Sequence, residues 1–504
     1  MTGTNFDITV RAGRRTLVDV QSFLLEEGRV TILFGESGIG KSLIGKSLFG
    51  IVDEETLRVR INGEPYDRFR ARPETRAWRK NGFFVFQEPS SHLNPLMTLG
   101  EQIREGDLAD TPAPAEILQE LWNDPQARPV RSLLPVYPTP YRPSGGEKQR
   151  ILAGMAFEKM DLRAKGRDSG GGLFVFDEPT GSLDREARDL FLDRLMDRFR
   201  RQPATVLLIT HDYSMIGHLR RGHADVQGAL RFLELTRTNG RVRVDEFAPG
   251  RYLDWLAARK PLRTPAAAGR PLLTVESGIE VFGRSFRFER GSAAGTPEDL
   301  HVYPGDLVYL KAGSGVGKTT IVKIIMGLQV AEHFRMMIEG VRLGEVSPKR
   351  FWRDVLWGKK LTMAFQHADE ALNPHATVDQ TLSILPSPAL RTSEGRMRVL
   401  RLLFDDHAIA SLRSKKVWQL SGGQKQRLNL LRAFSLSTPL VILDEPLNAL
   451  DFGSIGRVLD LMEEHRRGGH AILLISHNED IFDAVAAPER VYRLVASEHR
   501  PKRH

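Results

Sequence analysis

Two glycine-rich segments of the sequence end in a lysine and a hydroxyl residue, a spacing suited to holding a triphosphate. The segment from Gly35 to Ser42 matches G-x-x-x-x-G-K-S, in which backbone N–H groups converge on phosphate oxygens. The lysine reaches the β- and γ-phosphates, and the hydroxyl is a ligand for Mg²⁺. The predicted nucleotide contacts of this first segment are Gly35, Glu36, Ser37, Gly38, Ile39, Gly40, Lys41 and Ser42.

The second segment, from Ala312 to Thr319, has alanine where the pattern expects its first glycine. Alanine fits this position if its φ is negative and otherwise distorts the turn. We expect nucleotide binding here too. The predicted contacts are Gly313, Ser314, Gly315, Val316, Gly317, Lys318 and Thr319.

Two pairs of adjacent carboxylates could act on the bound triphosphate. Asp177-Glu178 and Asp444-Glu445 each follow a short apolar run. A buried parallel strand delivers the residues at its carboxyl end to a site at that edge of the sheet. We expect the aspartate to hold Mg²⁺ and the glutamate to polarise the attacking water. One such pair alone would more often be a helix N-cap, but the same arrangement occurs twice.

Two Ser-Gly-Gly segments precede helix-like runs at 151–157 and 428–434. A helix N-cap explains the serine, whereas the paired glycines also expose backbone N–H groups at a positive helix end. These groups could receive a γ-phosphate. The residues concerned are Ser144, Gly145 and Gly146 in the first segment and Ser421, Gly422, Gly423 and Gln424 in the second.

Two histidines, His211 and His477, each follow a β-rich apolar run, at 206–210 and 472–476. A single histidine at a strand end is more often structural. Recurrence beside a phosphate site favours a γ-phosphate sensor. Apolar, β-rich composition also predicts strands at 29–34 and 307–310. Each leads into a glycine-rich loop that is followed by a helix.

These groups form an internal repeat, since five landmarks recur in the same order between 266 and 279 residues later. The pairs are Lys41 and Lys318, Gln87 and Gln366, Ser144 and Ser421, Asp177 and Asp444, and His211 and His477. The first copy carries about ten extra residues at 158–172, which we predict to be a surface loop. A Pro/Ala-rich stretch at 259–271 separates the copies. We therefore expect domains at 1–245 and 272–504, joined by a linker at 246–271.

Composition agrees with a two-domain globular protein. The chain has 504 residues, 41% of them hydrophobic and 27% charged, and no cysteine, which excludes disulfides and thiolate chemistry. No apolar run approaches the length of a membrane-spanning helix, so we do not expect the chain to cross a membrane. The formal net charge of +9 is read as scattered surface charge rather than a nucleic-acid site, because no basic stripe is interleaved with aromatic residues.

The ordered set of glycine-rich loop, glutamine, Ser-Gly-Gly, Asp-Glu and histidine resembles the ATP-binding cassette (ABC) family. Ser-Gly-Gly followed by Lys-Gln-Arg is the specific part, and both copies carry the set. The resemblance implies an α/β fold with two P-loop domains in tandem. Each domain would have a RecA-like core, an antiparallel β subdomain and a helical subdomain, at about 87–144 or 366–421.

The resemblance also implies ATP and Mg²⁺ as cofactors and two composite sites formed by head-to-tail pairing of the halves. The first would join Lys41, Ser42, Gln87, Asp177, Glu178 and His211 to Ser421, Gly422 and Gly423. The second would join Lys318, Thr319, Gln366, Asp444, Glu445 and His477 to Ser144, Gly145 and Gly146. The Mg²⁺ ligands would be Ser42, Gln87 and Asp177, and Thr319, Gln366 and Asp444. The catalytic residues would be Gln87, Glu178 and His211, and Gln366, Glu445 and His477.

Departures from the family pattern collect in the second composite site. They are Ala312, and Pro143 and Glu147 where the partner motif has leucine and glutamine. We expect hydrolysis at both sites, the second being slower. Asp184 and Asp451 match the family's communicating loop. Phe6 and Phe282 are the candidates for the aromatic residue that stacks on the base, which leaves base specificity open.

The segment after Gln87 and its echo at 371–378 resemble ATPase subunits of peptide, nickel and glutathione importers. This resemblance implies two separately encoded permease subunits, a solute-binding protein and a peripheral position at the cytoplasmic face of the inner membrane, with no nucleic acid. The alternatives are a soluble tandem cassette acting on ribosomes or nucleic acid and a non-hydrolysing scaffold. The short Pro/Ala-rich stretch between the copies disfavours the first, and the two Asp-Glu pairs disfavour the second.

Overall fold

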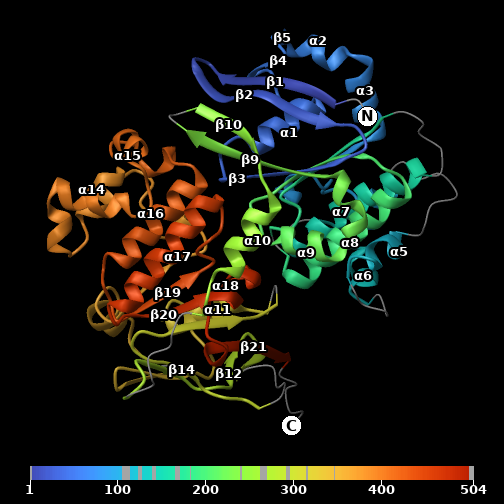
Figure 1. The fold of residues 1–504 in the computed structure, drawn as a ribbon. Coiled ribbons are helices and arrows are strands. Elements are labelled where there is room, and N and C mark those ends of the chain that lie inside the picture. The colour runs from blue at the N-terminus through green and yellow to red at the C-terminus, as the bar shows by residue number, and fades with distance from the viewer. Residues whose placement is uncertain are drawn as a thin grey trace. The chain divides into compact units, whose positions relative to one another are not determined.

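The chain folds into two units, Met1–Leu253 and Asp254–His504. The computed structural model describes residues 3–104, 114–122, 128–138, 143–164, 171–181, 183–238, 241–261, 269–290, 296–313, 316–344 and 347–498. Figure 1 shows the elements of both units in chain order. The division falls within helix α10 (Pro249–Ala257), inside the predicted linker, of which residues 262–268 lie outside the described part.

The first unit contains two sheets with helices packed against them. Its strands are β1 (Gly3–Ala12), β2 (Arg15–Glu26), β3 (Val30–Gly35), β4 (Arg58–Ile61), β5 (Glu64–Pro65), β6 (Phe83–Val85), β7 (Leu173–Asp177), β8 (Thr205–Ile209), β9 (Leu230–Thr238) and β10 (Arg241–Glu246). Its helices are α1 (Lys41–Phe49), α2 (Tyr66–Ala71), α3 (Pro73–Asn81), α4 (Leu99–Ile103), α5 (Pro114–Gln119), α6 (Arg128–Leu133), α7 (Gly145–Ala164), α8 (Arg185–Arg201) and α9 (Met215–Gly222).

The second unit repeats this plan. Its strands are β11 (Leu273–Val275), β12 (Ile279–Val281), β13 (Arg284–Arg290), β14 (Leu300–Val302), β15 (Leu307–Lys311), β16 (Arg335–Ile338), β17 (Val341–Gly344), β18 (Leu361–Ala364), β19 (Leu440–Asp444), β20 (Ala471–Ile475) and β21 (Val491–Glu498). Its helices are α11 (Lys318–Ile325), α12 (Lys349–Phe351), α13 (Val378–Ser383), α14 (Ser393–Arg401), α15 (Asp406–Leu412), α16 (Gly422–Phe434), α17 (Phe452–Arg467) and α18 (Glu479–Val485).

The core sheet of each unit holds its central strands in parallel. The order is β10-β9-β3-β8-β7-β6 in the first unit and β12-β13-β21-β15-β20-β19-β18 in the second. Every residue of β3, β7 and β8 is buried, and so is every residue of β19 and β20. Strands covered on both faces need continuous apolar runs, which explains their sequences. Because the strands run in parallel, their carboxyl ends meet along one edge of each sheet.

A second, antiparallel sheet packs into the core of each unit, with order β2-β1-β4-β5 or β14-β11-β16-β17. Its apolar side chains share a cluster with the parallel sheet. The segments between the glutamine and Ser-Gly-Gly landmarks contain short helices, α4 to α6 in the first unit and α13 to α15 in the second. The predicted α/β fold with antiparallel and helical subdomains is therefore confirmed.

The predicted surface loop at 158–172 is wrong over its first half. Helix α7 continues to Ala164, while residues 165–170 lie outside the described part. The segment Glu158–Ala164 consists mainly of good helix formers. Asp161 in it accepts hydrogen bonds from Arg198 of α8 at 2.8 and 3.0 Å. Across the described residues, no helix combines the length and the apolar character needed to span a membrane.

Candidate functional site

The first glycine-rich loop connects the buried strand β3 to α1. Gly40 caps α1 in a left-handed conformation, with φ of 119°. A Cβ atom at Gly40 would lie 2.5 Å from Cγ2 of Val18, so the position excludes a side chain on two grounds. The residue before α1 therefore has to be glycine. The first turn of α1 begins there, with N–H groups that have no carbonyl partner within the helix.

Lys41, the first residue of α1, is 5% exposed and points back into its own loop. Its ammonium group donates to the backbone oxygen of Gly35 at 2.5 Å and to that of Glu36 at 3.3 Å. The same Nζ atom lies 3.6 Å from Oε1 of Glu178. The loop thus carries a buried cation at the position where the sequence predicts the β- and γ-phosphates.

Ser42 and Asp177 meet at the carboxyl edge of the sheet. The Ser42 hydroxyl donates to Oδ1 of Asp177 at 2.9 Å. Burial of this carboxyl group raises the pKa of Asp177 to about 6, although the Ser42 hydrogen bond opposes the shift. A divalent cation beside this carboxylate would supply the missing positive charge, so the pair fits the predicted Mg²⁺ ligands.

Glu178 lies directly beyond β7 and faces His211, which follows β8. Oε2 of Glu178 is 2.8 Å from Nδ1 of His211. Burial raises the pKa of Glu178, but the charges of His211 and Lys41 and the hydrogen bonds from His211 outweigh it, so the pKa lies below its ordinary value. This carboxylate stays ionised, as a group that polarises water must. Its backbone has φ of 50°, and its N–H donates to the Ile209 oxygen at 2.9 Å.

The described part of the second loop resembles the first despite its alanine. Gly317 caps α11 with φ of 116°, and Lys318 donates to the Ala312 backbone oxygen at 2.7 Å. Of the described residues other than glycine, those with positive φ do not include Ala312, whereas Gly35 has φ of 147°. The alanine therefore occupies a conformation open to any residue, and its methyl group packs against the core. Ser314 and Gly315, both predicted nucleotide contacts, lie outside the described residues.

Asp444 is paired with Thr319, whose hydroxyl bonds to it, as Asp177 is with Ser42. Burial and the neighbouring Glu445 raise the pKa of Asp444 to about 7. Its Oδ2 atom is buried and has no hydrogen-bond partner. An unpartnered buried carboxylate oxygen is costly, and a cation would satisfy it. The donor set of the second unit therefore fits Mg²⁺ as well.

Glu445 is held more tightly than Glu178. Its carboxylate lies 2.7 Å from Nδ1 of His477 and accepts the His477 backbone N–H at 2.9 Å. The Ser476 hydroxyl donates to Oε2 of Glu445 at 2.7 Å. Burial is again outweighed by the interactions with His477, and the pKa of Glu445 lies below its ordinary value. The sequence reasoning missed Ser476, although its place before the recurring histidine marks it.

The two glutamines lie at the same sheet edges, but less buried. Gln87 is exposed, two residues beyond β6, and Gln366 is half-buried, two residues beyond β18. Both strands pair in parallel with the strand that carries the Asp-Glu pair. Glycine-rich loop, glutamine, carboxylates and histidine therefore occupy one edge in each unit.

The Ser-Gly-Gly residues begin the long helices α7 and α16. Ser144 and Glu147 exchange hydrogen bonds in a capping box at 2.7 and 3.3 Å, and Ser421 and Gln424 do the same at 3.1 and 3.2 Å. The serine is thus also a helix cap, as the simpler interpretation expected. Glu147 takes the structural place of Gln424 but adds a negative charge.

Residues just after Ser-Gly-Gly attach these helices to the sheet edge, a role that sequence reasoning did not assign. Gln149 donates to the Phe86 backbone oxygen at 3.4 Å, and Asn429 donates to that of Phe365 at 3.0 Å. Gln426 donates to the Glu445 backbone oxygen at 3.3 Å. The recurrence of Lys-Gln-Arg in both copies was the available signal.

The two candidate aromatic residues differ in position. Phe6 is 2% exposed and packs edge-on against Phe69 and Trp78, so it is part of the core and not free to stack on a base. Phe282 is 72% exposed on the turn between β12 and β13. Asp184 and Asp451 cap α8 and α17, accepting backbone N–H groups at 3.0 and 2.7 Å.

We expect Gly40→Ala to weaken ATP binding to the first unit by about tenfold or more. Alanine at φ near 119° would be forced against Val18 and would displace the loop that holds the phosphates, and a loss of about 1.4 kcal/mol of binding free energy equals a tenfold change in affinity. Gly63→Ala is the control, because Gly63 also has positive φ but a Cβ there meets nothing within 4 Å. Titration with a fluorescent ATP analogue measures both variants. An equal effect in the two would contradict the steric argument.

Comparison with known proteins places this arrangement in a family. The sequence profile of the family described as ABC transporter matches residues 18–162 and 297–448. The glutathione import ATP-binding protein GsiA of Pectobacterium atrosepticum is 27% identical over 94% of this chain and 81% of its own length. The peptidoglycan transport ATP-binding protein YejF of Agrobacterium fabrum is 28% identical over 93% of this chain and 86% of its own.

Among solved structures, RNase-L Inhibitor is similar in fold, with a TM-score of 0.63 and 18% identity over 97% of this chain and 90% of that chain. This likeness concerns the fold alone. The profile matches include the glycine-rich loop, the glutamine and the Ser-Gly-Gly segment of both halves, and the Asp-Glu pair of the second half. The chain, with its duplicated ATP-binding domain, is therefore an ATPase that belongs to the ABC transporter family.

Proposed function

We propose that this chain is the ATP-hydrolysing, energy-coupling subunit of an importer for glutathione, peptide-like or related small solutes. The observation that carries the proposal is the relationship to import and transport ATP-binding proteins over more than nine tenths of this chain. Both cassettes are included in that relationship, and both have a complete pair of carboxylates. The permease or solute-binding protein would determine which solute is carried.

In each unit the chain's own residues supply the parts of a phosphoryl transfer to water. The loop lysine neutralises charge on the terminal phosphates, and the backbone N–H groups of the first helical turn position them. Glu178 or Glu445, kept ionised, accepts hydrogen bonding from the attacking water, and the neighbouring histidine holds that carboxylate in place. When bound by Ser42 and Asp177, or by Thr319 and Asp444, Mg²⁺ would neutralise charge on the phosphate oxygens. Gln87 and Gln366 would complete these ligand sets.

We further infer that each ATP is shared between the P-loop of one half and the Ser-Gly-Gly segment of the other. The capped helix ends at Ser144 and Ser421 support this, because each presents N–H groups at the positive end of a helix of thirteen or more residues. The first site would combine the residues around Lys41 with Ser421, and the second those around Lys318 with Ser144. The domain limits at 1–245 and 272–504 remain part of this proposal.

Exposed apolar side chains near the importer-like segments support contact with a permease. Leu96 follows Asn94-Pro95 and is 84% exposed. In the second unit Ile384 and Trp418 are exposed, and the backbone N–H of Trp418 donates to the Pro374 backbone oxygen at 3.1 Å. Exposed apolar groups of this size are typical of protein interaction sites.

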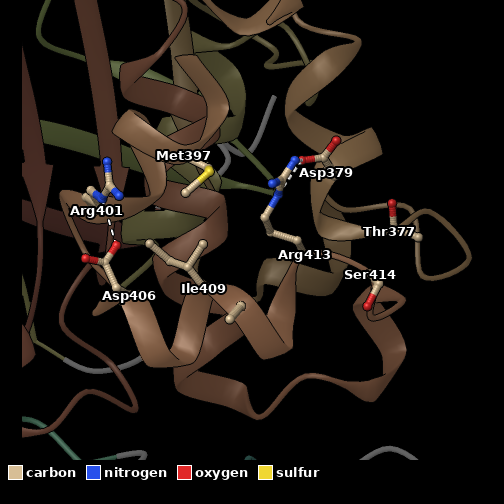
Figure 2. Close-up of a pocket in the computed structure, with 9 residues that line it drawn as sticks. Thr377, Asp379, Met397, Arg401, Asp406, Ile409, Arg413 and Ser414 are labelled. Atoms are coloured by element: carbon tan, nitrogen blue, oxygen red, sulfur yellow. Dashed lines mark hydrogen bonds and ion pairs between the residues drawn. The ribbon is translucent and has the colours of Figure 1, made fainter. Parts of the chain in front are cut away.

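The helical part of the second unit also contains a groove with a volume of ≈ 670 Å³. Its lining is Thr377, Asp379, Met397, Arg401, Asp406, Ile409, Ala410, Arg413 and Ser414. Figure 2 shows Arg413 turned toward Asp379 and Arg401 toward Asp406, at 2.7 Å in each pair. We propose that an amphipathic helix of a permease docks there, with apolar groups against Met397 and Ile409. Two permease subunits, a solute-binding protein and a peripheral position at the cytoplasmic face of the inner membrane belong to this proposal.

The test is affinity purification of the chain from detergent extracts of its own cells. We expect permease subunits to co-purify, and the ATPase rate to rise when the complex is reconstituted with its solute-binding protein. Leu96→Ser combined with Trp418→Ser should reduce permease recovery at least about fivefold, the loss of about 1 kcal/mol. Ribosomes or nucleic acid in place of permeases would overturn the importer and favour the soluble alternative.

A further inference from the structure

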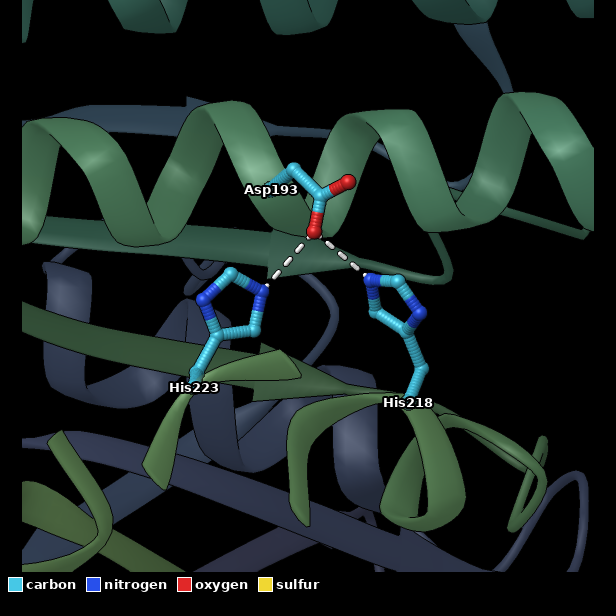
Figure 3. Close-up of side chains that lie close together, drawn as sticks. All are labelled: Asp193, His218 and His223. Atoms are coloured by element: carbon cyan, nitrogen blue, oxygen red, sulfur yellow. Dashed lines mark hydrogen bonds and ion pairs between the residues drawn. The ribbon is translucent and has the colours of Figure 1, made fainter. Parts of the chain in front are cut away.

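Two histidines and one carboxylate converge between α8 and α9 in the first unit, away from the groups assigned to ATP. Asp193 projects from α8, His218 from α9, and His223 follows the end of α9 (Figure 3). Oδ1 of Asp193 lies 2.7 Å from Nε2 of His218 and 2.8 Å from Nε2 of His223. One ligand atom from each residue falls within 4.8 Å of the other two.

The side chains differ in their access to solvent. His223 is buried, with 5% of its side chain exposed, whereas 21% of His218 and 41% of Asp193 are exposed. The cluster is therefore closed on the His223 side and open on the Asp193 side. Two imidazole nitrogens and a carboxylate oxygen are the donor set preferred by zinc and neighbouring transition metals, and three protein ligands leave one position for water.

The internal repeat shows that this cluster is not a general consequence of the fold. At the offsets that relate the two copies, Asp193 corresponds to Asp460, while His218 and His223 correspond to Ala484 and Glu489. Asp460 is 73% exposed and pairs instead with Arg259 at 3.4 Å. The aspartate thus occurs in both copies, whereas the two histidines that contact it occur only in the first.

We propose that Asp193, His218 and His223 form a binding site for one divalent transition-metal ion, of which Zn²⁺ is the best match. The ion is bound through Nε2 of both histidines and an oxygen of Asp193, with water completing a tetrahedron. The two distances from Nε2 to Oδ1 are hydrogen-bond lengths. To surround an ion with metal–ligand bonds of about 2.0–2.1 Å, the three ligand atoms have to move apart by a few tenths of an ångström.

The surroundings supply one supporting partner and one competitor. Oδ2 of Asp189 lies 3.5 Å from Nδ1 of His218, in the position of the carboxylate that usually orients a metal-bound imidazole. On His223, Nδ1 accepts a hydrogen bond from Arg200 at 2.8 Å, which places the ring proton on Nε2. A metal ion on Nε2 moves that proton to Nδ1, so Arg200 has to turn away. Arg200 also donates to Asp225 at 2.6 and 2.8 Å, and these bonds can hold its guanidinium group once it has left His223.

A bound ion would connect α8, which Asp184 caps, to α9, which follows His211. Asp193 and its partners therefore link two segments that begin at predicted parts of the ATP site. When the ion binds, metal–ligand bonds replace the two hydrogen bonds to Asp193, and each neutral imidazole carries its one ring proton on Nδ1, where Asp189 can accept it from His218.

The test is titration of untagged, EDTA-treated, nucleotide-free protein with Co²⁺, whose visible absorption reports tetrahedral nitrogen and oxygen ligands. We expect one Co²⁺ per chain, displaced by Zn²⁺. His218→Gln combined with His223→Gln should weaken binding at least about 100-fold, because even supporting residues of such sites are worth 10–100-fold. Full-affinity binding in this double variant, or no saturable binding in the wild type, would overturn the site.

The second unit supplies a matched control. His465 and His470 have the same five-residue spacing, and their rings stack at 4.5 Å without an acidic third ligand in the described structure. His465→Gln combined with His470→Gln should leave Co²⁺ binding unchanged. Since buried His223 also contributes to packing, the single variant His218→Gln serves if the double variant is unstable, and should weaken binding at least about tenfold.

A second test uses Arg200, which competes with the ion for His223. Arg200→Gln removes the donor from Nδ1 of His223 and offers an amide oxygen to the displaced proton, so Co²⁺ should bind several-fold more tightly. Zn²⁺ should raise the unfolding temperature of the wild type and the control, but not of the double histidine variant. Weaker binding in Arg200→Gln would contradict coordination through Nε2.

Discussion

Replacing both catalytic glutamates, Glu178→Gln with Glu445→Gln, is expected to lower ATP turnover at least about 100-fold while ATP is still bound. General-base catalysis by a positioned side chain is worth about 10²–10⁴-fold. Glutamine keeps the shape of the side chain but loses the charge that polarises water. Each carboxylate is buried and ionised, and the histidine beside it is engaged in holding that carboxylate. Steady-state phosphate release and nucleotide retention on a filter measure the two properties.

The single variants should differ, with Glu178→Gln costing more than about tenfold and Glu445→Gln about two- to fivefold. Ala312 does not explain this asymmetry, because its φ is ordinary and Lys318 bonds to its oxygen as Lys41 does to that of Gly35. The reason is Glu147, whose negative charge lies at the helix end proposed to receive the γ-phosphate of the second site. Equal losses in the two single variants would remove the asymmetry.

Asp444→Asn is expected to abolish Mg²⁺-dependent hydrolysis at the second site and yet stabilise the nucleotide-free protein at pH 8. The folded-state pKa of Asp444 is raised to about 7, above its ordinary value of 3.8. A raised pKa means that the folded protein binds the proton more strongly, so stability is lost as pH rises from about 4 to 7. Asparagine removes the buried charge, and an unfolding temperature higher by roughly 3–6 °C should follow.

The effect should disappear at pH 5, where the wild-type Asp444 is protonated. Glu394→Gln is a control, since Glu394 is 85% exposed and its replacement should not change the unfolding temperature at either pH. In the nucleotide-free protein, protons should compete with Mg²⁺ below pH 7 at Asp444 and below pH 6 at Asp177, whose pKa is raised to about 6. A destabilised Asp444→Asn protein at pH 8 would contradict this account.

The fold and the sheet-edge positions could be predicted because they depend on local patterns. Apolar runs such as 173–176 have to be buried strands, and polar residues directly after them have to meet at the carboxyl edge of a parallel sheet. The internal repeat strengthened these predictions, because each motif had to occur in the same structural position in both halves. The head-to-tail pairing of the halves rests on the family resemblance and stays a prediction.

Other features depend on contacts between residues distant in the sequence. Phe6 looked available for a nucleotide base, but Phe69 and Trp78 enclose it in the core. The helical continuation to Ala164 was hidden by the polar residues that follow it. Asp193 and His223 are thirty residues apart, and only the packing of α8 against α9 brings them together.

In the described structure, the loop lysine of each unit is never left as a lone buried ion, because it bonds to a carbonyl oxygen of its own loop. When a triphosphate enters, the lysine therefore exchanges its carbonyl partner for a phosphate oxygen, and this exchange needs no refolding of the loop. When phosphate departs, the ammonium group returns to the oxygen of Gly35 or Ala312 and product release does not strand a desolvated charge. We expect this exchange to lower the net affinity for nucleotide, since binding replaces a lysine–carbonyl bond instead of adding a new one.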